Sequence, residues 1–247
     1  MFDRLRSYFK NDAELPPEQK ERIDKLERII GITVDNPFIY IRALRHRSTL
    51  VDDNFSSTDS YERLEFLGDA VLDLIVTEII FDLFPEKNEG FLTKLRAKLV
   101  KGDALAMYAR NLKLYELMLL GERVKGQGIE KSKSVLADVF EALVGAVYLD
   151  LGYEPTSCFV RDVIEQFVNF DQITNALDNY KSLLLEFAQA HQMEIPTYEV
   201  VSEEGPGHDK TFGIQVYVDS KPMAQGIGKS KKEAEQKAAR KALERLK

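Results

Sequence analysis

The spacing of apolar residues changes near residue 171 of this 247-residue chain, and this change constrains the fold more than any other feature. Before it, apolar residues recur every three or four positions through the segments 61–84, 90–111, 134–151 and 155–170, which predicts amphipathic helices. After it, a helical segment at 181–192 precedes residues 212–218, where apolar side chains alternate strictly and predict a strand. We therefore expect two domains, the first of them all-helical.

The polar segment between the two patterns is predicted to be a linker. Residues 171–179 show no period, and we place the linker at 172–178, after a variable charged extension at 1–21 and a helical domain at 22–171. In the remaining residues, 179–247, the order helix, three strands, helix predicts an antiparallel sheet covered on one face by two helices. The expected fold class is an all-α domain followed by a small α+β domain of order α-β-β-β-α.

Charge and composition limit the possible partners and compartments. The net charge is −7, yet residues 229–247 carry eight Lys or Arg against three Asp or Glu, so attraction to a polyanion is concentrated in the last helix. The single Cys158 rules out an intramolecular disulfide framework. The N-terminus lacks the apolar core of a secretory signal, and acidic residues interrupt the longest apolar run, 71–84. We expect a cytoplasmic protein with no membrane partner.

Two pairs of carboxylates interrupt apolar helical segments of the first domain. Glu65 and Asp69 are four positions apart, and Asp138 and Glu141 are three apart, so each pair shares one face of its helix. Burying a carboxylate is costly unless its charge is compensated, and four converging carboxylates suit a hard cation such as Mg²⁺. The alternative is that each acid caps a helix or pairs with a neighbouring Lys or Arg.

Several segments resemble known families. Residues 62–70, Glu-Arg-Leu-Glu-Phe-Leu-Gly-Asp-Ala, are similar to the signature of the ribonuclease III family, as are the shorter segments 43–48, 88–90, 95–97 and 136–143. The Gly-Pro-Gly-His segment at 205–208 and the lysine-rich segment at 229–239 resemble the double-stranded RNA-binding domain. Both resemblances follow the order of the ribonuclease III family and extend from about residue 22 to the C-terminus.

The resemblance implies an endoribonuclease that hydrolyses double-stranded RNA with a Mg²⁺-activated water. The expected products carry 5′-phosphate and 3′-hydroxyl ends with a short 3′ overhang, and the expected substrates are ribosomal RNA precursors and other structured transcripts. Glu65, Asp69, Asp138 and Glu141 would bind the metal, with Asp69 and Glu141 as catalytic residues. Mn²⁺ could replace Mg²⁺, and no organic cofactor is expected. The competing class, a non-catalytic RNA-binding protein of the same fold, would be expected to lose these four carboxylates.

Other residues are implied as RNA contacts or as support for the metal site: Glu62, Glu89, His46, His208, Lys229, Ser230, Lys231 and Lys232. Lysines at the start of a helix add charge to its exposed N–H groups, which suits phosphate. For His46 a buried structural role is equally open. Leu185 stands where the family usually has Gln, which weakens the expectation of one polar contact to RNA.

Phe66, directly beside Glu65, has two open interpretations. It could fill the core of its own domain. The resemblance instead implies that it projects into a socket on a second subunit of a homodimer. A two-fold axis would then place two sites across one RNA duplex, one for each strand.

Overall fold

The computed structural model describes residues 14–52, 56–177, 179–206 and 210–246. The chain divides into two compact units, residues 1–174 and 175–247, and each is described by itself. Of the predicted extension 1–21, the described part already enters a helix at Pro17.

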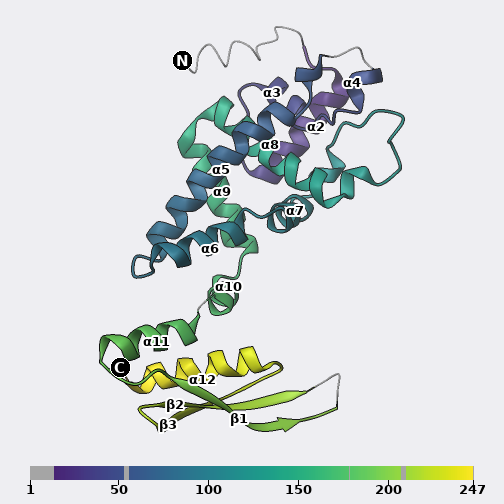
Figure 1. Cartoon of the computed structure of the whole chain (residues 1–247). Helices are drawn as coiled ribbons and strands as arrows, with labels where there is room; N and C mark the ends of the chain where they lie inside the picture. The colour runs from purple at the N-terminus through teal and green to yellow at the C-terminus, as the bar shows by residue number, and fades with distance from the viewer. Residues whose placement is uncertain (1–13, 53–55, 178, 207–209, 247) are drawn as a thin grey trace. The chain divides into compact units, whose positions relative to one another are not determined.

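The described residues of the first unit form helices (Figure 1). A single isolated β-bridge there joins Arg45 to Leu119, so the prediction of an all-helical domain is confirmed. The α-helices are α2 (Pro17–Ile30), α3 (Pro37–Ala43), α4 (Thr49–Asp52), α5 (Glu62–Leu83), α6 (Glu89–Leu99), α7 (Gly102–Asn111), α8 (Lys133–Leu151), α9 (Tyr153–Phe167) and α10 (Phe170–Leu177). Helix α10 crosses the boundary between the two units. Short 3₁₀ turns lie at η1 (Ser57–Asp59), η2 (Leu114–Glu116) and η3 (Ile129–Lys131).

Helix α8 is the centre of this unit and packs against α3, α5, α7 and α9 (Figure 1). Its contact with α5 is especially close because a glycine stands on each side. A Cβ atom at Gly68 would overlap the carbonyl oxygen of Glu141, and one at Gly145 would overlap that of Leu64. The two helix backbones can therefore touch at the level where α5 and α8 carry the predicted metal ligands.

A buried carboxylate fixes the start of α3 against the end of α8. Asp150 accepts hydrogen bonds from the backbone N–H groups of Asp35 and Asn36, at 2.9 and 3.0 Å. The Tyr40 hydroxyl group donates a third, at 3.1 Å. Because a buried carboxylate needs such partners, these bonds account for an acid in the core.

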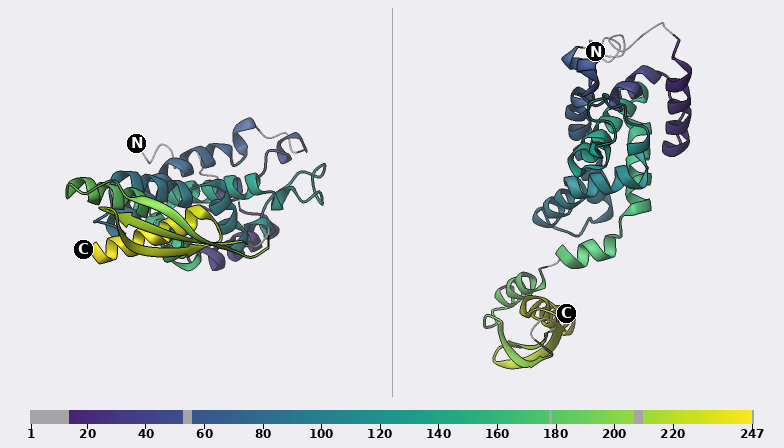
Figure 2. Two further views of the ribbon diagram at one scale, coloured as in Figure 1. Left: turned by 60° about the horizontal axis from the view of Figure 1, so that its bottom comes forward. Right: turned by 90° about the vertical axis from the view of Figure 1, so that its right-hand side faces the viewer.

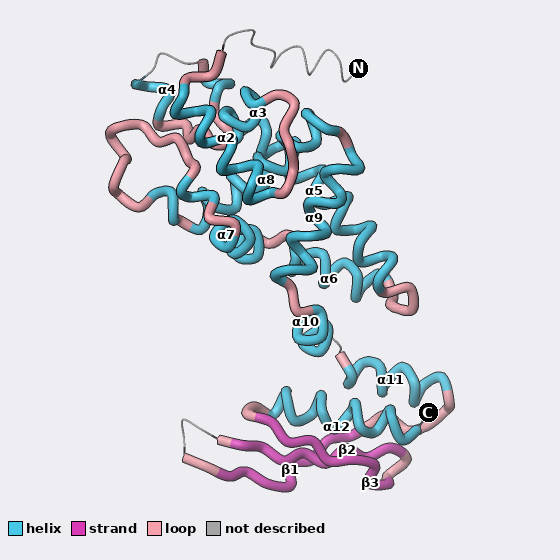
Figure 3. Tube along the Cα trace, turned by 180° about the vertical axis from the view of Figure 1, so that it is seen from behind, coloured by secondary structure: helices cyan, strands magenta, loops and turns pink. Residues whose placement is uncertain are grey.

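The second unit has the predicted α-β-β-β-α order: α11 (Tyr180–Ala190), β1 (Thr197–Glu204), β2 (Thr211–Val218), β3 (Lys221–Gly228) and α12 (Lys231–Leu246). The strands form an antiparallel sheet in the order β1-β2-β3. Both helices lie on the same face of the sheet (Figures 2 and 3). Ala238 and Ala242 of α12 are fully buried beside Val216, because small side chains let this helix lie close to the strands.

Two sequence predictions differ from the structure. The segment 171–179, which is predicted to be a linker because its sequence shows no period, is helical over residues 171–177, which belong to α10. The Asn169 side chain accepts the N–H of Gln172 at the start of this helix, and the Phe170 ring packs 5.8 Å from that of Phe84. The predicted helical segment 90–111 is divided into α6 and α7, because Lys101 has an extended backbone.

None of the helices in the described ranges combines the length and apolar character needed to cross a lipid bilayer.

Candidate metal centre

Three of the predicted ligands converge where α5 and α8 are in contact. Glu65 lies on α5 and Asp138 and Glu141 on α8, and one oxygen atom from each lies within 4.8 Å of the other two. All three side chains are half-buried. Their oxygen atoms form a set that a hard divalent cation prefers.

The electrostatics of this cluster favour binding of a cation. Burial, together with the charges of Asp69, Glu65 and Asp138, raises the pKa of Glu141 to about 8. Burial and neighbouring carboxylates also raise the pKa of Glu65, and burial raises that of Asp138. A bound divalent cation would offset the repulsion that causes these shifts.

Asp69 lies at the edge of the cluster. It is one helical turn beyond Glu65 on α5 and its side chain is exposed. It does not belong to the group of three oxygen atoms, although its charge contributes to the raised pKa of Glu65 and of Glu141. The structure thus brings together three of the four predicted ligands, and the role of Asp69 stays a prediction.

The alternative that these acids form ion pairs finds no support in the described part of the chain. There, neither Glu65 nor Glu141 pairs with a Lys or Arg side chain, and the hydrogen-bond partner of Asp138 is the Tyr61 hydroxyl group at 3.3 Å. The positive charge of Arg47 lowers the pKa of Asp138, but burial outweighs this effect and the pKa stays above its ordinary value. Among the described residues, the three carboxylates therefore face one another with no Lys or Arg side chain in an ion pair with any of them.

Tyr61 is a residue of the site that the sequence did not reveal. It is buried between the start of α5 and Asp138, and burial and the nearby carboxylates raise its pKa. Its ring lies 5.9 Å from that of His46. No sequence pattern singles out this residue, because its partner Asp138 is 77 positions away.

Glu62 and Glu89 lie outside the group of three carboxylates. Glu62 is exposed, 3.8 Å from Arg47, and accepts a hydrogen bond from Ser60 Oγ at 3.4 Å. Glu89 is exposed in the first turn of α6 and accepts one from Thr93 Oγ1 at 2.8 Å. Both positions leave the carboxylates accessible, as contacts to RNA or to bound water would require.

His46 is buried, and its environment fits the structural alternative. Its Nδ1 atom accepts the backbone N–H of Ser48 at 3.1 Å, which leaves the ring proton on Nε2 in the neutral form. Burial and the charge of Arg47 lower its pKa. Ser48 Oγ in turn accepts the N–H of Gly121 at 2.9 Å, so His46 helps to join two loops.

Phe66 is 84% exposed, so the interpretation of this residue as core filler is wrong. On the same helix Leu74 is 52% and Phe81 is 67% exposed. Spacings of 8 and 15 positions place the three side chains along one stripe of a helix. This extension of the apolar surface beyond Phe66 was missed, although its helical spacing is visible in the sequence.

In the second unit the predicted phosphate-binding residues lie together at the start of α12. Lys229, Ser230, Lys231 and Lys232 are all exposed. Ser230 Oγ accepts the N–H of Glu233 at 3.2 Å, and the Glu233 carboxylate accepts the N–H of Lys229 at 2.9 Å. These bonds cap the helix and leave the lysine side chains accessible. His208 lies outside the described residues.

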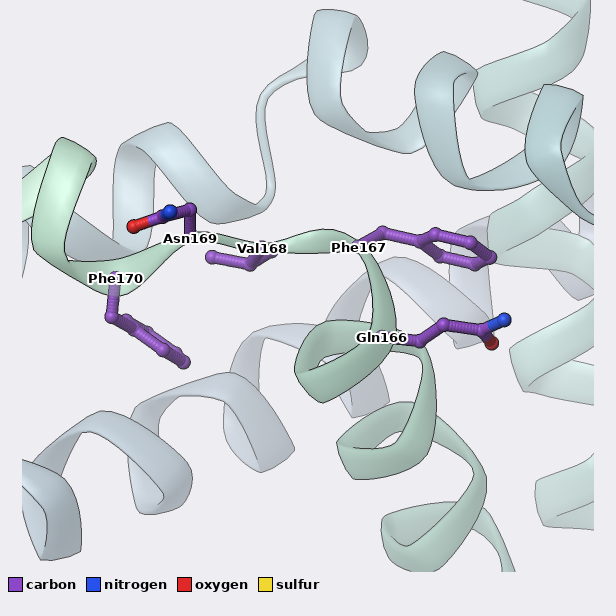
Figure 4. Close-up of a pocket in the computed structure, with 5 residues that line it drawn as sticks. All are labelled: Gln166, Phe167, Val168, Asn169 and Phe170. Atoms are coloured by element: carbon purple, nitrogen blue, oxygen red, sulfur yellow. The ribbon is translucent and has the colours of Figure 1, made fainter.

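A separate hollow of about 440 Å³ lies where α9 ends and α10 begins. Its walls are Gln166, Phe167, Val168, Asn169 and Phe170. The side chains of Gln166 and Phe167 point away from those of Asn169 and Phe170 (Figure 4). None of these five side chains is charged, and they do not converge on one point, so this hollow offers no catalytic or metal site.

Comparison with known proteins places these features in context. Residues 36–167 match a family model described as ribonuclease-III-like, and residues 180–246 match the double-stranded RNA binding motif. The chain is 44% identical to Ribonuclease 3 of Chlorobaculum tepidum over 213 residues, which cover 85% of this chain and 78% of that protein. It is 39% identical to Ribonuclease 3 of Staphylococcus epidermidis over 229 residues, covering 93% of each.

A solved structure is similar to the first unit. It is the nuclease domain of ribonuclease III from Campylobacter jejuni, and its description concerns flexibility in a region involved in dimer formation. The match has 38% sequence identity and a TM-score of 0.54 and covers 60% of this chain and 99% of that one.

Proposed function

Because this chain is a member of the ribonuclease III family, we propose that it is an endoribonuclease specific for double-stranded RNA and that it cleaves at the cluster of Glu65, Asp138 and Glu141. The observation that carries the assignment of the site is the convergence of these carboxylates at the contact between α5 and α8. A non-catalytic relative would have no need for half-buried carboxylates that repel one another.

The same three residues would hold Mg²⁺ or Mn²⁺, with Asp69 completing the site from its edge. A bound cation of this kind supplies an activated water and stabilises the charge on the leaving oxygen. The protein's own contribution is to position the ligands on two helices in contact. Glu141, whose pKa is about 8 in the absence of metal, must release its proton to serve as a ligand. Asp69 and Glu141 are the proposed catalytic residues, and hydrolysis would leave 5′-phosphate and 3′-hydroxyl ends.

The second unit would deliver the duplex. Side chains cannot read the narrow major groove of A-form RNA, so such a domain grips phosphates and the minor groove. The exposed lysines at the start of α12 are suited to phosphate, with His208 as a further contact. Glu62 and Glu89 would act beside the metal centre. Ribosomal RNA precursors and other structured transcripts in the cytoplasm are the proposed substrates.

The protein would act as a homodimer. The Phe66 side chain, next to the metal ligand Glu65, is 84% exposed. Contact of this apolar surface with water costs free energy, and a second subunit that covers it would remove this cost. The nuclease domain from Campylobacter jejuni has a region described as involved in dimer formation. Two sites related by a two-fold axis would each cut one strand, which accounts for a short 3′ overhang.

The test is cleavage of a perfect RNA duplex by the full chain in Mg²⁺ and in chelator. We expect cleavage only in Mg²⁺, and we expect Glu141→Gln to remove cleavage while it leaves binding of the duplex unchanged. Glu165→Gln, which alters an exposed acid on α9, is the matched control and should stay active. Cleavage in chelator would argue against the metal, and an active Glu141→Gln variant would remove Glu141 from its role. If the wild type binds the duplex but never cuts it, the non-catalytic alternative is correct.

A further inference from the structure

We infer that Tyr61 is a positioning residue of the metal centre, whose hydroxyl group orients the Asp138 carboxylate toward Glu65 and Glu141. The inference rests on the proposed function, because it presumes that these carboxylates bind a cation. It adds a residue that holds a ligand in place without itself touching the metal.

The side chain of Tyr61 is placed to act on one oxygen of Asp138. Tyr61 is 4% exposed, and its hydroxyl group donates to Asp138 Oδ2 at 3.3 Å. This distance is long for an O–H···O bond, so its effect is one of orientation more than of strength. A hydroxyl group that engages one oxygen of the carboxylate limits the rotation of the Asp138 side chain, in the way that partners of metal ligands commonly fix ligand geometry.

The backbone of Tyr61 is hydrogen-bonded to α5, the helix that carries Glu65. Its carbonyl oxygen accepts the N–H groups of Leu64 and Glu65, at 2.8 and 2.9 Å, which forms the first turn of α5. Its own N–H donates to the carbonyl oxygen of Arg45 at 3.0 Å. Tyr61 therefore touches Glu65 through its backbone and Asp138 through its side chain, so it couples the two helices at the cluster.

A second tyrosine–aspartate pair shows how a structural role differs. Tyr40 donates to Asp150 Oδ2 at 3.1 Å, but Asp150 also accepts two backbone N–H groups, which would hold it without the tyrosine. Across the described residues, Tyr61 is the one side chain that donates to Asp138. Twelve positions of α8 separate the two aspartates, or about 18 Å, so Tyr40 cannot act on the cluster.

The test compares Tyr61→Phe with Tyr40→Phe, each of which removes one hydroxyl group and keeps the ring. Mn²⁺ affinity is measured without RNA, from the paramagnetic resonance of free Mn²⁺, and the Mg²⁺ concentration for half-maximal cleavage is measured with RNA. We expect Tyr61→Phe to weaken Mn²⁺ binding and to raise the Mg²⁺ midpoint by about tenfold, with cleavage largely recovered at saturating Mg²⁺. Tyr40→Phe should leave both quantities at the wild-type value, even if it lowers the melting temperature.

Asp138→Asn separates failure of this inference from failure of the proposed site. If Asp138→Asn weakens Mn²⁺ binding and Tyr61→Phe does not, Tyr61 has no positioning role and the site stands. If neither variant changes Mn²⁺ binding, the proposed site itself is wrong and the inference falls with it. Should Tyr61→Phe not fold, the wild-type protein decides: Mg²⁺ should shift the ¹³Cζ resonance of Tyr61 but not that of Tyr40, and an unmoved Tyr61 signal overturns the inference.

Discussion

Glu141 shows how strongly one residue can link metal binding to pH. Burial and the neighbouring carboxylates raise the pKa of Glu141 to about 8, so at neutral pH its proton must leave before it binds a cation. We predict that the affinity for Mn²⁺ rises by up to about tenfold per pH unit below pH 8 and levels off above it, because one proton is displaced. Titrations at pH 6, 7, 8 and 9 measure this. An affinity independent of pH would show that Glu141 is already ionised.

The same shift predicts a loss of stability in the absence of metal. The ordinary pKa of a glutamate here is 4.5, so between that value and about 8 the folded state binds more protons than the unfolded state. Its stability must then fall as the pH rises through this range. In chelator, the melting temperature of the wild type should decrease more between pH 6 and pH 8 than that of Glu141→Gln, because the amide of the variant does not titrate. Equal losses would assign the pH dependence to other groups.

Single residues also show which features of the site could not be predicted from the sequence. Spacing identified Glu65, Asp138 and Glu141, because carboxylates in apolar helices are conspicuous. The same spacing could not place Asp69 at the edge of the cluster, since that depends on where α8 crosses α5. Phe66 stayed ambiguous because an apolar residue on a helix looks the same whether it faces a core or another subunit. Tyr61 carried no signal, as its partner is far away in sequence.

At the scale of elements, the contact between α5 and α8 decides the geometry of the site. We predict that Gly68→Ala lowers the free energy of unfolding by about 1–3 kcal/mol, because the new Cβ would overlap the carbonyl oxygen of Glu141 and force the helices apart. The displacement moves Glu65 away from Glu141, so the affinity for Mn²⁺ should fall as well. Denaturant unfolding and Mn²⁺ titration measure the two effects.

Gly90→Ala is the matched control for this helical glycine. A Cβ at Gly90, in the first turn of α6, would lie 3.7 Å from Asn88 Oδ1, an ordinary contact. We expect this variant to be neutral or to gain up to about 1 kcal/mol, since alanine favours a helix more than glycine. If Gly68→Ala behaves like Gly90→Ala, close approach of the two helices is not what holds the ligands together.

The elements themselves were largely predictable, and the exceptions have physical causes. The strands and helices of the second unit were predictable because the spacing of apolar residues changes clearly from the helical to the strand pattern. Helix α10 was missed because its apolar residues, among them Phe170 and Ile173, are interspersed with Asp, Gln, Thr and Asn, and because the Asn169 cap was not recognised. The break between α6 and α7 was missed because the apolar spacing continues across it, although the backbone of Lys101 is extended.

At the scale of the whole molecule, α5 carries the surface that we assign to the dimer. We predict that Phe66→Ala weakens self-association, because this side chain is 84% exposed in the single chain and would be buried in the dimer. Sedimentation velocity across a concentration series measures the shift. Where the variant is monomeric, duplex RNA should be nicked on one strand and not cut on both. Ile227→Ala, which alters an exposed side chain of the second unit, should change neither result.

Charge is divided between the two units, so the second unit should dominate the attraction to RNA. The chain has a net charge of −7, but the start of α12 presents three exposed lysines. We predict that deletion of residues 179–247 weakens binding of duplex RNA at physiological salt and flattens the dependence of log affinity on log salt, because the deletion removes lysines that displace counterions from phosphate. Filter binding of the wild type and the deletion at several salt concentrations measures both quantities.

The double variant Lys231→Ala and Lys232→Ala assigns this effect to α12. It should reduce the salt slope by roughly one for each phosphate that no longer has a lysine partner, while cleavage at low salt continues because the metal centre is intact. Lys221→Ala, which removes an exposed lysine at the start of β3, is the control and should leave the slope unchanged. If the double variant and the deletion both bind as tightly as the wild type across the titration, the first unit must hold the duplex by itself. Its acidic surface would then have to bind cations before it could approach phosphate.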